Sequence, residues 1–113
     1  TAWVNVLSIY AYMNLPSRGM WSASKAAALS LAQCLRAEMR GAGVRGVNVF
    51  PGPVDHEWEQ RTPPPRVAPA AIATAIVRAL KDGIEDVYVG DVAQEFRARL
   101  AENPKGLERE LGA

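Results

Sequence analysis

Residues 2–8 read AWVNVLS, a run of apolar and β-branched side chains that only Asn5 interrupts. A continuous apolar run of this length is typical of a strand buried on both faces, as in a parallel sheet. A second run, VRGVNVF at 44–50, is halted by Pro51-Gly52-Pro53, and a third run occupies residues 85–89. The sequence therefore predicts three buried strands.

Helix-forming patterns separate and follow these strands. They combine apolar residues at helical spacing with Gly, Pro or Asn at their ends, and they cover residues 19–40, 69–82, 91–103 and a short segment from 104. Asp91 is the expected N-cap of the third helix. Strands that alternate with helices imply right-handed crossovers. The fold class is therefore α/β, with three parallel strands, and residues 1–113 are expected to form a single domain.

Composition excludes several classes of protein. The chain has 113 residues, and 13 Lys and Arg against 12 Asp and Glu leave a net charge of +1, which argues against a dedicated nucleic-acid binder. No stretch approaches the ~18 uninterrupted apolar residues of a membrane span. One cysteine, Cys34, and one histidine, His56, allow no disulfide framework and supply metal ligands poorly, so no metal site is expected. A cytoplasmic location fits these features.

Three motifs and their order carry a family resemblance. They are NVLS at 5–8, WSASK at 21–25 and VNVFPGPVD at 47–55. Together they resemble the second half of a short-chain dehydrogenase/reductase (SDR), and the resemblance extends over essentially the whole chain. It implies the C-terminal half of a Rossmann-like, doubly wound parallel sheet. It also implies an oxidoreductase that transfers hydride between NAD(P) and a carbonyl or alcohol.

The same resemblance assigns the reacting residues. Ser8 takes the position of the serine that orients the substrate carbonyl. Lys25 takes the position of the lysine that lowers the pKa of the catalytic tyrosine and holds the nicotinamide ribose. Trp21 occupies the tyrosine position itself, where an indole N–H can donate a hydrogen bond but cannot act as general acid or base. Tyr10 or Tyr12, in the loop after Ser8, compensates for Trp21 only if its hydroxyl reaches that place.

Only part of a cofactor site matches the family. Besides Lys25, the residues that correspond to the nicotinamide end are Pro51, Gly52, Val54 and His56, the last standing where a threonine is common. GxxxGxG, one of the glycine-rich turns that hold the pyrophosphate, does not occur in the sequence. The GxGxxG at 41–46 lies between a predicted helix and a predicted strand, and not between a strand and the helix that follows it, as the pyrophosphate turn requires. NAD(P) is therefore the cofactor implied by resemblance, and very weak binding or none is expected of this chain alone.

Three functional hypotheses remain open. In the first, the chain is homologous to an oxidoreductase but inactive by itself, because it lacks the N-terminal cofactor-binding half and the catalytic tyrosine. In the second, it is active once an N-terminal half or a partner chain completes it. In the third, it is a non-catalytic oligomerising module.

Two surfaces favour self-association. The 2–8 strand would expose an apolar edge, because the family's neighbouring strand is not part of the chain. The 19–40 helix would expose a face that carries Ala23, Ala27 and Leu31. A homodimer or higher oligomer is expected through one of these surfaces.

Each candidate site residue also has a structural interpretation. Ser8 could bond only to the adjacent loop, Lys25 could be a solvated helix residue, and Trp21 could pack on the buried side of its helix. His56 could be a surface loop residue. Cys34 is expected to be a small apolar filler within the helix.

Overall fold

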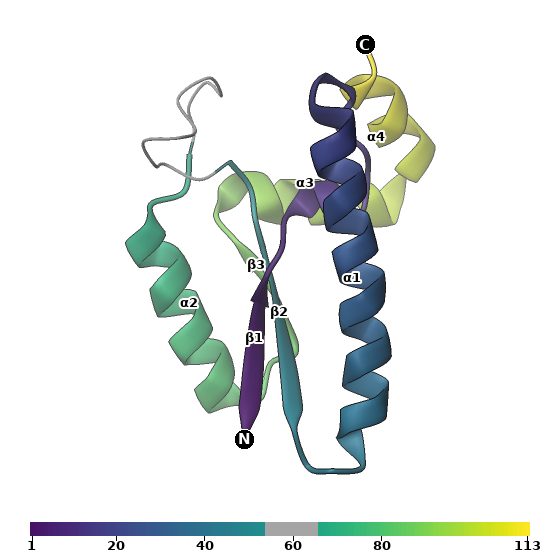
Figure 1. Ribbon diagram of the computed structural model, residues 1–113. Helices are drawn as coiled ribbons and strands as arrows, with labels where there is room; N and C mark the ends of the chain where they lie inside the picture. The colour runs from purple at the N-terminus through teal and green to yellow at the C-terminus, as the bar shows by residue number, and fades with distance from the viewer. Residues whose placement is uncertain (54–65) are drawn as a thin grey trace.

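The computed structural model describes residues 1–53 and 66–113 and shows an α/β fold (Figure 1). Its strands form one parallel sheet in the order β1-β2-β3. The fold class expected from the sequence is confirmed. The elements, in chain order, are β1 (Ala2–Val6), η1 (Ile9–Ala11), η2 (Pro16–Arg18), α1 (Gly19–Arg40), β2 (Arg45–Pro51), α2 (Pro69–Asp82), β3 (Asp86–Val89), α3 (Asp91–Glu102) and α4 (Pro104–Leu111).

Helices cover both faces of the sheet. Figure 1 shows α1 and α2 on opposite sides of the strands, with α3 and α4 beyond their carboxyl ends. Alternation along β2 explains the two cores, because successive side chains point to opposite faces. Val47 and Val49 pack in one core with Ile72 of α2, whereas Phe50 packs in the other with Leu29 of α1.

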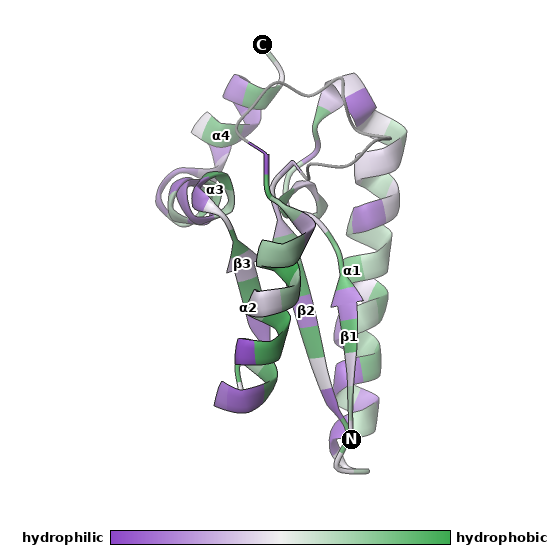
Figure 2. Ribbon diagram, turned by 90° about the vertical axis from the view of Figure 1, so that its left-hand side faces the viewer, coloured by the Kyte–Doolittle hydropathy of each residue, from purple (hydrophilic) through white to green (hydrophobic). Residues whose placement is uncertain are grey.

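The central and edge strands differ in burial. In Figure 2, which looks onto the α2 side, β2 lies between β1 and β3. Its residues from Gly46 to Pro51 are all buried, as a parallel core strand requires. In β1, however, Ala2 and Val6 are exposed and the three residues between them are half-buried. The expectation of a first strand buried on both faces was therefore wrong, because β1 pairs with β2 alone among the described strands.

The ends of the elements follow local chemistry. The first strand ends at Val6 rather than at residue 8, because Ser8 already caps η1. Gly90, and not Asp91, is the N-cap of α3. The chain turns there at φ 94°, a conformation that glycine adopts readily, and a Cβ at this position would lie 2.8 Å from Val67 Cγ2.

The long helix α1 packs against the sheet along one side only. Its buried residues are Ser22, Leu29 and Ala32. Cys34 is exposed, so the expectation that it fills the core was wrong. None of the helices in the described residues is both long and apolar enough to cross a membrane.

Candidate functional site

Ser8 lies directly beyond the carboxyl end of β1. It is only 5% exposed, and its Oγ accepts a hydrogen bond from the Tyr10 backbone N–H at 3.1 Å. This bond caps η1, so Ser8 does bond to the adjacent loop, as its purely structural interpretation expects. A hydroxyl that accepts one bond keeps its own proton, and it can donate that proton to a carbonyl oxygen.

Ser22 holds the start of α1 against η1. Its Oγ donates to the Tyr10 carbonyl at 2.6 Å and accepts from the Leu15 N–H at 3.2 Å. The residue is 1% exposed. The motif did not single it out, yet it sets the position of Trp21 and Lys25 relative to Ser8. In the sequence, the one sign of this role was the place of Ser22 within the WSASK motif, between Trp21 and Lys25.

Trp21 lies in the first turn of α1, next to η1. Its indole is 39% exposed, so the expectation that it packs on the buried side of the helix was wrong. The Tyr10 ring lies against it, with centroids 6.3 Å apart and planes tilted by 59°. Lys25 Nζ lies 5.9 Å from the indole centroid, and Arg18 Cζ lies 5.7 Å from it on the preceding turn. Lys25 is half-buried rather than fully solvated.

Neither tyrosine of the following loop has the electrostatics of a catalytic phenol. Burial raises the pKa of Tyr10, whose ring meets Phe96 edge-on at 5.7 Å. Burial and a hydrogen bond with Tyr88 raise the pKa of Tyr12, whose ring lies 4.9 Å from that of Phe50. A catalytic tyrosine needs its pKa lowered toward neutrality, so both shifts have the opposite sign.

The Pro51-Gly52 pair lies at the carboxyl end of β2, beside the end of β1. The Leu7 N–H donates to the Val49 carbonyl at 2.8 Å, which continues the pairing of the two strands toward this edge. A Cβ on Gly52 would lie 3.3 Å from Val92 at the start of α3, so the chain passes tightly there. Val54 and His56 lie outside the described residues.

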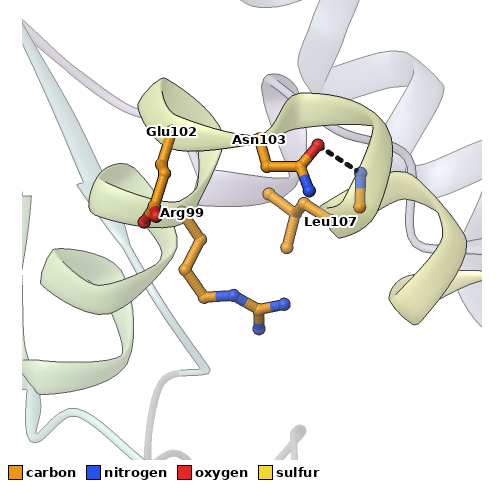
Figure 3. Close-up of a pocket in the computed structure, with 5 residues that line it drawn as sticks. Arg99, Glu102, Asn103 and Leu107 are labelled. Carbon is orange, nitrogen blue, oxygen red and sulfur yellow. Dashed lines mark hydrogen bonds between the residues drawn. The ribbon is translucent and has the colours of Figure 1, made fainter.

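Pockets occur around this edge and beyond it. One of about 290 Å³ lies where α2 and α3 begin, lined by Arg66, Val67, Ala68, Ala71, Gly90, Asp91 and Val92. A second, of about 230 Å³, reaches Tyr10 from the α3–α4 side. A third, of about 240 Å³, lies at the α3–α4 turn (Figure 3). Asn103 caps α4 there through a 3.0 Å bond from the Gly106 N–H, and Arg99 is paired with Glu110. None of the sequence-assigned site residues that the structure describes lines this third pocket.

A parallel sheet with helices on both faces defines a Rossmann-like α/β protein. Members of this class bind ligands at the carboxyl ends of the strands, where Ser8 and Gly52 lie in this chain. The family model described as short chain dehydrogenase matches residues 2–67, more than half of the chain. The chain therefore belongs to the short-chain dehydrogenase family.

Solved structures agree with this assignment. A short chain dehydrogenase from Burkholderia cenocepacia J2315, in complex with NADP, is 43% identical over 97% of this chain, with a TM-score of 0.91. A short chain dehydrogenase/reductase from Burkholderia phymatum, in complex with NAD, is 21% identical over 78% of the chain, with a TM-score of 0.64. The bulky-bulky ketone specific alcohol dehydrogenase from Comamonas testosteroni is 22% identical over 96%, with a TM-score of 0.66. The last two show the fold alone.

The matches cover only part of each relative. This chain spans 46% of the Burkholderia cenocepacia structure, 42% of the Burkholderia phymatum structure and 43% of the Comamonas testosteroni structure. Comparison with curated proteins gives no match.

Proposed function

We propose that the chain contributes the substrate side and the nicotinamide end of a short-chain dehydrogenase site in which an indole replaces the proton-transferring phenol. On this proposal the 113-residue chain alone is inactive in hydride transfer between NAD(P) and a carbonyl or alcohol. The observation that carries it is Trp21, which stands one helical turn before a half-buried Lys25. The indole N–H can donate a hydrogen bond there but has no proton to exchange near neutral pH.

The described residues fit a nicotinamide cofactor at one end only. Lys25 can donate to the ribose hydroxyls, and Pro51 and Gly52 lie at the carboxyl end of β2, where the Val92 side chain packs against Gly52. A bound nicotinamide cofactor would supply the hydride, while Ser8 would donate to the substrate oxygen. Pyrophosphate is held in this fold class by the amides of a glycine-rich turn between a strand and the next helix, whereas the GxGxxG at 41–46 lies between α1 and β2.

The decisive experiment joins residues 1–113 to the preceding half of the NADP-bound Burkholderia cenocepacia protein. We expect this chimera to bind NADPH and to show no measurable reduction of an aromatic aldehyde. Trp21→Tyr should restore turnover by a factor of about 10² or more, since a positioned acid contributes about that much. Trp21→Phe is the matched control and should stay inactive.

Two outcomes of this experiment contradict the proposal. Turnover by the unmodified chimera at the rate of the Trp21→Tyr variant would support the alternative, an oxidoreductase that is active once a second half or partner chain completes it. Full NADPH binding with no gain from Trp21→Tyr would mean that Ser8, Trp21 and Lys25 do not form the remnant of a catalytic site.

An oligomerising role is the second candidate, and one observation favours it. The side of α1 that faces away from the sheet exposes large apolar side chains, with Met20 87%, Leu31 60% and Leu35 40% exposed. Ala23 and Ala27, also exposed, lie between them. Helix faces of this kind normally pack against another surface. We propose that two copies associate through this face or through the open edge of β1.

A further inference from the structure

The pocket of about 230 Å³ where η1, α3 and α4 meet is built from one face of each helix. Its lining residues recur at intervals of three and four along α3 and again along α4, so they lie on the sides of the helices that face the pocket. We call it the Tyr10 pocket, and its lining residues are Tyr10 of η1, Val92, Glu95, Phe96 and Arg99 of α3, and Leu107, Glu110 and Leu111 of α4. Ligand pockets commonly measure about 300–1,000 Å³, so this one suits a ligand of one ring with a short substituent.

Apolar side chains form most of the wall of the Tyr10 pocket. Phe96 and Leu107 are buried, and the Tyr10 ring meets the Phe96 ring edge-on with centroids 5.7 Å apart. Val92 and Leu111 are half-buried and complete this part of the wall. Aromatic and aliphatic side chains in such a wall pack against the apolar part of a ligand.

The charged residues of the wall leave one negative charge without a partner. Arg99 is paired with Glu110 through both of its terminal guanidinium nitrogens, so these two charges offset each other. Among the described residues, Glu95 has no hydrogen-bond or ion-pair partner. Its carboxylate is therefore the group in this wall that is available to a ligand.

Cations on the neighbouring elements lie outside this wall. Those of η2, of the first half of α1 and of α3 and α4, apart from Arg99, are Arg18, Lys25, Arg97, Lys105 and Arg109. Arg97 lies over the Tyr88 ring, 4.8 Å from its centroid, and Lys105 is paired with Glu108. A ligand in the Tyr10 pocket therefore meets a wall of net negative charge.

We propose that the Tyr10 pocket binds small organic ammonium ions that carry one aromatic ring. The ring would pack against the apolar wall, and the ammonium would donate hydrogen bonds to the Glu95 carboxylate. Neither Ser8 nor Trp21 nor Lys25 lines this pocket. The inference therefore goes beyond the proposed hydride-transfer site and does not depend on it.

Preference for an ammonium over its neutral isostere is the signature of this site. Benzylamine, like a lysine side chain, is protonated near neutral pH, whereas benzyl alcohol has nearly the same shape without the charge. Apolar packing alone would bind the two equally. Because Glu95 is exposed, solvent and salt screen its attraction, and we expect a preference of about fivefold that falls as salt is added.

The test uses the 113-residue chain and titrates both probes at low ionic strength, with binding followed by NMR at the backbone amides of Tyr10, Glu95 and Leu111. We expect both probes to shift these amides saturably, with benzylamine bound about fivefold more tightly. Glu95→Gln should make the two affinities equal. Glu102→Gln is the matched control and should keep the preference, because Glu102 is an exposed carboxylate of the same helix that lines the neighbouring pocket instead (Figure 3). Leu111→Ala should weaken both probes by a similar factor.

Equal affinity for the two probes in the unmodified chain would overturn the proposal. A preference that survives Glu95→Gln would do the same, as would shifts confined to amides outside the Tyr10 pocket. Glu95 and Glu102 are both exposed, so these substitutions leave the packing of the fold in place. The outcome is separable from the chimera experiment, because loss of the ammonium preference leaves the hydride-transfer proposal standing, and failure of Trp21→Tyr to restore turnover leaves ammonium binding standing.

Discussion

Ser22 joins two parts of the site through a single oxygen. Its Oγ bonds both the Tyr10 carbonyl and the Leu15 N–H, and the residue is 1% exposed. We expect Ser22→Ala to lower the free energy of unfolding by about 1–3 kcal/mol, because two backbone groups of half-buried residues lose their partner. Chemical denaturation measures this directly.

Ser24→Ala is the matched control for that substitution. Among the described residues, Ser24 Oγ donates only to the Trp21 carbonyl of the same helix, and Ser24 is exposed. Its removal should change the free energy of unfolding by less than about 0.5 kcal/mol. Equal losses for the two variants would mean that the Ser22 bonds do not hold α1 against η1.

Tyr10 and Tyr12 make stability depend on alkaline pH. Both pKa values are raised in the folded protein, so the folded state keeps phenol protons that the unfolded state loses near pH 10. The stabilising contribution is fully present below pH 10 and is lost as pH rises toward the folded pKa values, with a slope of at most about 1.4 kcal/mol per pH unit for each group. Urea unfolding between pH 8 and 11 should show this decline. Tyr12→Phe should make it shallower, and an identical slope in that variant would contradict the assignment.

The residue scale also shows where sequence reasoning ends. The grouping of Ser8, Trp21 and Lys25 stays a prediction from the family resemblance. The structure shows the start of α1 packed against η1, the turn that follows Ser8, through Ser22 and Trp21. The exposure of Trp21 could not be predicted, since it depends on where Tyr10 directs its ring. The structural role of Ser22 depends on carbonyl directions within η1, which a residue pattern does not encode.

At the scale of elements, the sequence predicts type and order well and strand burial less well. The runs at 2–8 and 44–50 are both mainly apolar, yet only β2 is buried from its second residue to its end. The difference arises from position in the sheet, because β2 has neighbours on both sides. The parallel pairing of the strands was predicted correctly, because it follows from the alternation of strands and helices along the chain and not from the burial of any one strand.

The pairing of β1 with β2 depends on a glycine in β2. A Cβ on Gly46 would lie 2.8 Å from the ring of Trp3, its partner in the register. We expect Gly46→Ala to lower the free energy of unfolding by about 1–3 kcal/mol through overpacking. Gly41→Ala, at the end of α1 with nothing within 4 Å of its Cβ, is the control. It should be neutral or slightly stabilising, because it reduces the entropy of the unfolded chain. A neutral Gly46→Ala would show that Trp3 moves away at no cost.

At the scale of the whole molecule, the proposed nicotinamide end is not accompanied by a glycine-rich turn between a strand and the helix that follows it. We therefore expect tryptophan fluorescence to stay flat when NADH or NADPH is added to the 113-residue chain up to millimolar concentration, after correction for absorbance. Adenine and pyrophosphate contacts supply binding that the remaining residues cannot replace. Saturable quenching in the micromolar range would contradict this and would mean that an assembly of chains rebuilds a dinucleotide site.

The exposed apolar face of α1 and the open edge of β1 both predict that copies of the chain associate. We expect the chain to sediment as a dimer or larger species at micromolar concentration, and Leu31→Glu to shift it toward monomer. An isologous contact presents each substitution twice, so one buried glutamate per chain is disruptive. Val77→Glu on α2, where the native side chain is 51% exposed, is the control and should leave the assembly intact.

If Val6→Lys dissociates the assembly and Leu31→Glu does not, the open edge of β1 is the contact, because a lysine on an edge strand opposes strand addition. If the unmodified chain is a monomer, association through either surface is contradicted. The apolar face of α1 would then stay exposed to water, and the rest of the fold would have to offset that unfavourable free energy.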